Sequence, residues 1–129
     1  MAANPAFIGT PRLTVASLST QNTALDGSGT ITALMTGAAS GTRVLEIDTQ
    51  CSATSAAGLV NVFLSTDSGA TWTLFDQISI GSATVSNTGK ANRQLATYTN
   101  LILPDTTFRI GVTTTISQAI RVWAMGGNF

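Results

Sequence analysis

With 129 residues, the chain is long enough for one domain that buries roughly two-thirds of its unfolded surface. Only 9% of its residues are charged, six cations balance six anions, and histidine is absent. This composition argues against nucleic-acid binding through phosphate contacts, and against Ser-His-Asp, Cys-His or Cys/His zinc chemistry.

The sequence predicts a surface built largely from neutral polar residues. Thr and Ser fill 34 of the 129 positions, whereas only 12 side chains are charged. A soluble monomer usually covers its surface with about 25–35% charged residues. The mean hydropathy of +0.29 also leaves much apolar area to place. We therefore expect partner subunits to cover part of the surface, which predicts a homo-oligomer.

No stretch of the sequence predicts export or a membrane partner. The start, MAANPAFIGTPRL, lacks the charged and apolar regions of a signal peptide, and no 18 apolar residues run together. Synthesis is therefore expected in the cytoplasm. The single Cys51 cannot form an internal disulfide, and its neutral neighbours Gln50 and Ser52 do not favour a reactive thiolate.

Residues 1–11 include two prolines and a glycine, which predicts an extended N-terminal arm without a core of its own. Phe7 and Ile8 in this arm are candidate contacts to a neighbouring subunit or a shell. Residues 12–129 are expected to form a single domain.

Eight segments of that domain show the period-2 alternation of half-buried strands. Turn residues separate them at roughly even spacing, and no segment has the helical period. The expected strands are residues 12–18, 29–36, 42–49, 60–65, 72–80, 94–103, 107–114 and 117–125. This pattern predicts an all-β fold, a single antiparallel β-sandwich of about eight strands with a jelly-roll-like arrangement.

Alternation also assigns residues to faces. The polar stretch 81–93 is expected to be a loop that is either mobile or faces a partner. In strand 12–18, Leu13 and Val15 are expected on one face. In strand 42–49, Leu45 and Ile47 are expected on one face, and Val44, Glu46 and Asp48 on the opposite face. In strand 117–125, one face is expected to carry Ile120, Val122 and Ala124, and the opposite face Arg121, Trp123 and Met125.

The strands within residues 58–80 are joined by STDSGATW, which fits the pattern S-x-D-x-G-x-T-W. This octapeptide resembles the Asp-box, a hairpin motif of several β folds. Its Asp can accept backbone N–H groups across the turn, its Gly permits a positive φ, and its Trp packs under the loop. No chemistry is expected at this turn. Its predicted structural residues are Ser65, Asp67, Gly69 and Trp72.

Few residues indicate chemistry of any kind. Glu46 and Asp48 are the one close carboxylate pair, about 7 Å apart along a strand. Such a pair could suit a glycosidase, but a pair that faces solvent or contacts Arg43 or Arg121 is far more common. Asp26 lies in a DGSG turn that lacks the further carboxylates of a calcium loop. No enzyme is expected, and no catalytic, cofactor-binding or metal-binding residue is predicted.

Four segments together resemble small tailed-bacteriophage virion proteins, which are β-sandwich proteins found as head decoration (cement) or as related surface components. The segments are TALDGSGTITAL (23–34), TRVLEID (42–48), VFLSTDSGATWTLFDQISI (62–80) and IRVWAMGGNF (120–129). The resemblance implies a non-enzymatic homo-oligomer, commonly a trimer, bound to the major capsid protein on the surface of the phage head. It brings no catalytic residue, and the long polar stretch 81–93 departs from it.

Two other functions stay open. A tail or baseplate component of the same kind of particle would use the same sandwich. A carbohydrate-binding module is suggested by the Asp-box-like turn and the jelly-roll pattern, because sugar rings stack on exposed aromatic side chains. Trp123 and Tyr98 are the aromatic residues expected to be exposed, and Trp123 is also a candidate subunit contact.

Overall fold

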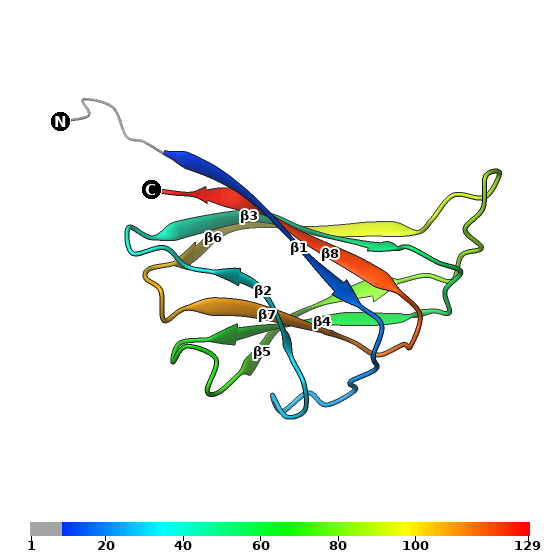
Figure 1. The fold of residues 1–129 in the computed structure, drawn as a ribbon, viewed down its shortest axis with the longest axis horizontal. Coiled ribbons are helices and arrows are strands. Elements are labelled where there is room, and N and C mark those ends of the chain that lie inside the picture. The colour runs from blue at the N-terminus through cyan, green and yellow to red at the C-terminus, as the bar shows by residue number, and fades with distance from the viewer. Residues whose placement is uncertain (1–8) are drawn as a thin grey trace.

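The computed structural model describes residues 9–129, which form eight antiparallel strands in two layers (Figure 1). A membrane-spanning helix is not found anywhere in this part of the chain. The predicted all-β fold is confirmed. The strands are β1 (Thr10–Leu18), β2 (Thr32–Thr36), β3 (Thr42–Cys51), β4 (Gly58–Ser65), β5 (Thr73–Ile80), β6 (Arg93–Leu103), β7 (Arg109–Thr114) and β8 (Ile120–Asn128).

Each layer is a four-stranded sheet. The order β1-β8-β3-β6 forms what we call the terminal sheet, because it contains the first and the last strand. The order β2-β7-β4-β5 forms the hairpin sheet, named after the β4–β5 hairpin. Apart from the β4–β5 hairpin, each connection between consecutive strands crosses from one sheet to the other. This is the strand order of a jelly roll, so the predicted jelly-roll-like sandwich is confirmed.

The hydrophobic core lies between the two sheets. Apolar side chains at alternate positions of each strand point into this layer, where they are removed from water. In β8 the buried face is the predicted one, Ile120 with Val122 and Ala124. The fully buried apolar residues that fill the layer include Val44, Ile47, Val60, Val62, Ile110, Val112, Ile120 and Val122.

Both ends of the described chain differ from the predicted boundaries. The arm was expected to extend through residue 11, but β1 already begins at Thr10, and Pro11 pairs with Gly127. The predicted contacts Phe7 and Ile8 lie outside the described residues. The last strand does not stop at residue 125, because β8 is a central strand and its end keeps pairing with both β1 and β3.

A β-bulge in β3 overturns one predicted face. The register of β3 shifts between Val44 and Glu46 toward both of its neighbours, and against β8 this places one extra residue, Leu45, in β3. Val44 and Ile47 are therefore both buried, whereas Leu45 is 37% exposed. The expectation that Leu45 shares a face with Ile47 was wrong, and so was the grouping of Val44 with the two carboxylates.

The outer face of the hairpin sheet is covered by the chain itself. Gly111 in β7 faces outward, and a Cβ at this position would lie 2.9 Å from the Trp72 ring and 2.5 Å from Ile31. Phe63, which pairs with Gly111 and so shares its outward face, is fully buried. The β1–β2 connection, residues 19–31, and Trp72 therefore form a lid over the two central strands of this sheet.

Candidate functional site

The outer face of the terminal sheet has no such cover within the described residues. Leu13 and Val15 in β1 point outward and are 66% and 57% exposed, whereas Ala16 and Leu18 of the same strand are buried. Leu95 and Ile102 of β6 are 49% and 46% exposed on the same face. Together with Leu45 in β3, these make five of the eight exposed large apolar side chains in the described chain. We call this surface the terminal face.

Register brings the terminal face together in rows across the four strands. Val15 pairs with Trp123, Trp123 with Asp48, and Asp48 with Leu95. Directly paired residues of neighbouring strands have Cβ atoms about 4.5–5.5 Å apart, so each row is a continuous strip of side chains. On one side of this strip, the neighbouring strip runs from Leu13 through Met125 and Glu46 to Thr97, and on the other side a strip runs from Ser17 through Arg121 and Gln50 to Arg93.

A charged cluster lies at the centre of this surface. Asp48 is only 1% exposed although it points outward, and Arg93 Nη2 donates a hydrogen bond to Asp48 Oδ2. Arg93 is therefore the partner of this pair, not Arg43 or Arg121 as the sequence suggested. Asp48 Oδ1 is buried and has no donor in the described structure while both carboxylates are ionised.

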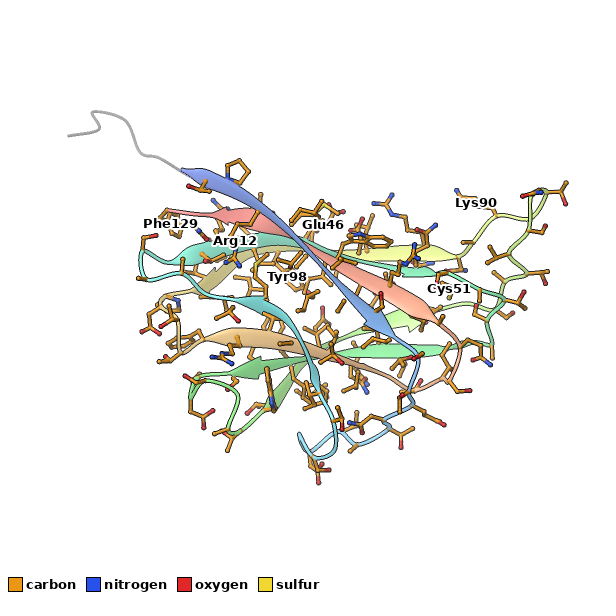
Figure 2. The ribbon with its side chains drawn as sticks, in the orientation of Figure 1. Arg12, Glu46, Cys51, Lys90, Tyr98 and Phe129 are labelled. Carbon is orange, nitrogen blue, oxygen red and sulfur yellow. The ribbon has the colours of Figure 1, made fainter. Side chains whose placement is uncertain are left out.

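Glu46, labelled in Figure 2, lies on the same face of β3 as Asp48, as predicted. A hydrogen bond between the two carboxyl groups raises the pKa of Glu46, and partial burial and the negative charge of Asp48 raise it further. Arg93 opposes this shift only in part. The pair thus has more negative charge than the neighbouring guanidinium offsets.

A shallow cavity of about 290 Å³ opens above this cluster. Asp48 and Arg93 form its polar side, and apolar side chains form its walls. The lining residues are Leu13, Asp48, Gln50, Arg93, Trp123 and Met125. A cavity with a buried carboxylate at its base and apolar walls suits a long aliphatic side chain that ends in a cation.

The two aromatic residues predicted to be exposed occupy different environments. Trp123 lies on the terminal face and is partly exposed. Tyr98 is also partly exposed, but it packs against the core, and its hydroxyl donates a 2.8 Å hydrogen bond to Asp76 Oδ2. Burial, followed by this hydrogen bond, raises the pKa of Tyr98. Among residues 9–129, the most exposed aromatic residues are Phe75 and Phe129.

The Asp-box-like turn is closed by its own side chains. Asp67 Oδ1 accepts the Thr71 backbone N–H at 2.9 Å, and Asp67 Oδ2 accepts the Thr71 hydroxyl at 2.5 Å. Ser65 Oγ donates to Asp67 at 2.8 Å and accepts the Gly69 N–H at 2.8 Å. The hydrogen bonds from Thr71, then that from Ser65, lower the pKa of Asp67 to about 2. Gly69 has a φ of 89°, the left-handed conformation for which glycine was predicted here.

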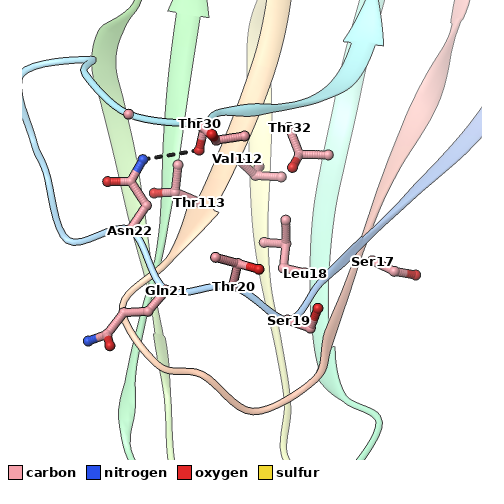
Figure 3. Close-up of a pocket in the computed structure, with 11 residues that line it drawn as sticks. Ser17, Leu18, Ser19, Thr20, Gln21, Asn22, Thr30, Thr32, Val112 and Thr113 are labelled. Atoms are coloured by element: carbon pink, nitrogen blue, oxygen red, sulfur yellow. Dashed lines mark hydrogen bonds between the residues drawn. The ribbon is translucent and has the colours of Figure 1, made fainter.

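A second cavity, of about 430 Å³, lies between the end of β1, the β1–β2 connection and β7 (Figure 3). Its walls are mostly hydroxyl and amide side chains, and Asn22 Nδ2 donates to the Thr30 carbonyl across its rim. It contains neither a charged group nor an aromatic ring on which a sugar could stack. The cavity is therefore a weaker candidate than the terminal face.

The connection between β5 and β6, residues 81–92, projects beyond the end of the sandwich (Figure 1). Ser86 orders its tip, because Ser86 Oγ accepts the Thr88 and Gly89 N–H groups and Ser86 N donates to the Gly89 carbonyl. Lys90, the single lysine, follows this tip and is exposed (Figure 2). Among the described residues the one salt bridge is Arg93–Asp48, so Lys90 has no ionic partner there.

Residues 9–129 contain no cluster of three or more His, Cys, Asp or Glu side chains that could hold a metal ion. Cys51 is buried. Comparison of the chain with models of protein families, with curated proteins and with solved structures found no match.

Sequence reasoning found the carboxylate pair and Trp123 but missed Arg93, Leu13 and Leu95 as members of one surface. Their proximity follows from the pairing of β6 with β3 and of β1 with β8. No local pattern encodes such pairing. The available signal was the position of Arg93 directly after a long polar loop, where a strand begins.

Proposed function

We propose that this protein is a non-enzymatic structural component of a virion, a decoration protein that binds the outer surface of a phage head and stabilises its shell. The observation that carries the proposal is the terminal face. Monomeric proteins rarely leave a large contiguous apolar surface in water. A four-stranded sheet face measures about 19 by 26 Å, from strand spacing and rise, which is about 500 Å² and matches the smaller specific protein interfaces.

The arrangement of the chain ends also supports the proposal. Gly9 N donates a 2.7 Å hydrogen bond to the Asn128 carbonyl, so the chain enters β1 beside its own C-terminal strand. Residues 1–8 precede this corner, and Phe7 and Ile8 among them stay the predicted contacts to the major capsid protein. The oligomer, for which a trimer is expected, would then present several copies of this corner to the shell.

A binding experiment with shells that lack the protein tests this function. Purified protein should co-sediment with the shells, and binding should persist at about 1 M salt because apolar contacts are not screened. Occupied shells should release their DNA at a higher temperature, because attachment stabilises the closed state. Shells with and without the protein that open at the same temperature would contradict the proposal.

Particle reconstruction distinguishes the head from the tail. Density for the jelly roll on the head surface is the expected result. Density confined to the tail or baseplate would overturn the decoration function in favour of the tail component.

A further inference from the structure

The acidic centre of the terminal face lacks one cation. Asp48 lines the cavity but is only 1% exposed, one of its oxygens is held by Arg93, and the other is buried and has no donor while Glu46 is ionised. A buried carboxylate oxygen without a partner is strongly unfavourable, and nearly all such groups in folded proteins are satisfied. A positively charged side chain that entered the cavity would satisfy Asp48 and contact Glu46.

The same chain carries a cation that lacks an anion. Lys90 is exposed on the projecting connection between β5 and β6 and forms no salt bridge with the described residues. Its stem of four methylene groups suits the apolar walls formed by Leu13, Trp123 and Met125, and its ammonium group suits the carboxylates. The hydrogen bonds of Ser86 hold the neighbouring tip in one conformation, which lowers the entropy lost on docking.

Stacking two terminal faces directly on each other is a poor alternative. Glu46 and Asp48 lie on β3, one of the two central strands, so stacking would bring the acidic centres of both copies together in a desolvated interface. A contact between the projecting connection of one copy and the terminal face of the next avoids this repulsion. Such a contact joins two different surfaces, and it closes into a ring when the rotation between neighbouring copies divides a full turn.

We propose that the cavity over Asp48 receives Lys90 from a second copy of this chain, so that copies join head to tail into a closed ring. The apolar side chains around the cavity supply most of the buried area, and the ion pair fixes the register of the two copies. The raised pKa of Glu46 agrees with this role, because an added cation would relieve the repulsion between the carboxylates. This inference rests on the homo-oligomer of the proposed function but not on shell binding.

A charge exchange in the full-length protein tests the contact. K90E and E46K should each weaken self-association at least about tenfold in sedimentation equilibrium, because each places like charges together. The double variant K90E/E46K should return the association constant to within about threefold of the wild type. The control K90E/D26K has the same net charge, but its new lysine lies in the exposed turn of the β1–β2 connection, and it should stay weak.

Circular dichroism must show an unchanged β spectrum for each variant that enters the comparison. The head-to-tail contact would be overturned by any one of three results. These are single variants that associate like the wild type, a control double variant that recovers association as well as the exchange variant does, and a wild-type protein that is monomeric. So would loss of shell binding in E46K with the oligomer intact, because the occupant of the cavity would then be a shell protein. A ring that forms normally but binds no shell would overturn the proposed function alone.

Discussion

The two outer faces of the sandwich differ in what covers them. On the hairpin sheet, Phe63 points outward yet is fully buried under the lid formed by Trp72 and residues 19–31. On the terminal sheet, Leu13 and Val15 point outward and are mostly exposed. Within residues 9–129 the chain therefore covers one sheet with its own connection and leaves the outer face of the other sheet open. The exposed apolar side chains of the described residues are not spread evenly over the surface, because most of them lie on the terminal face.

Truncation of the covered face should have the largest effect on stability. Phe63→Ala removes a fully buried aromatic ring from beneath the lid. We expect the free energy of unfolding to fall by about 3–5 kcal/mol, because the substitution loses apolar burial and leaves a cavity. Urea denaturation of the purified protein measures this change. A loss below about 1 kcal/mol would mean that the lid does not pack as a second core.

The Asp-box-like turn, which positions Trp72 in the lid, should have the next effect. Asp67→Asn should lower the thermal midpoint by less than Phe63→Ala does, because it weakens hydrogen bonds within a turn.

The same variant should alter acid stability. The folded pKa of Asp67, about 2, lies below its ordinary value of 3.8, so ionised Asp67 stabilises the fold above about pH 4. This stabilisation is lost as the pH falls from 4 through 2. Thermal melts across this range should be flatter for Asp67→Asn than for the wild type. Curves of identical slope would show that Asp67 is not held by the turn in solution.

Substitution on the uncovered face should separate stability from association. Leu13→Thr with Val15→Thr keeps residues that favour strands, and we expect each change to alter unfolding of the isolated domain by only about 0.5 kcal/mol or less. Self-association or shell binding should weaken, because the interface loses apolar area. Leu25→Thr, at a 51% exposed residue of the β1–β2 connection, is the matched control. Equal weakening by this control would remove the distinction between the two faces.

The smallest effect is expected at the acidic centre. The folded pKa of Glu46 is raised above its ordinary value of 4.5, so protonated Glu46 stabilises the isolated fold at low pH. That contribution is lost as the pH rises through and above 4.5. Glu46→Gln keeps a hydrogen-bond donor at every pH, so its stability should change less between pH 4 and 7. Equilibrium unfolding at several pH values measures the difference, and a steeper profile in the variant would contradict the shared hydrogen bond.

The sequence allowed the strand count and the jelly-roll class to be predicted because each strand carries its own alternation and each turn its own breakers. It could not tell which of two apolar faces points inward. In β1, Leu13 and Val15 form as good an apolar stripe as Ala16 and Leu18, and only packing against the second sheet decides between them. The bulge at Leu45 was equally hidden, because it arises from pairing with two neighbouring strands.

The candidate site could be predicted only in part, for the same reason. Glu46, Asp48 and Trp123 stood out as residue types on strands with a clear pattern. Arg93 joins them through the register between β3 and β6, which pairs residues 45 positions apart. A single sequence contains no direct signal for a contact at that separation.

The pairing of β1 with β8 has a consequence for how the chain folds. These strands are the first and last of the described chain, and they pair along their whole length from Thr10–Asn128 to Leu18–Ile120. β8 is also a neighbour of β3, so the terminal sheet cannot assemble until the C-terminal residues have left the ribosome. The β4–β5 hairpin needs only local contacts and can form much earlier. We therefore expect slow folding with a late, cooperative closure, during which Leu13 and Val15 are open to mispairing with other unfinished chains.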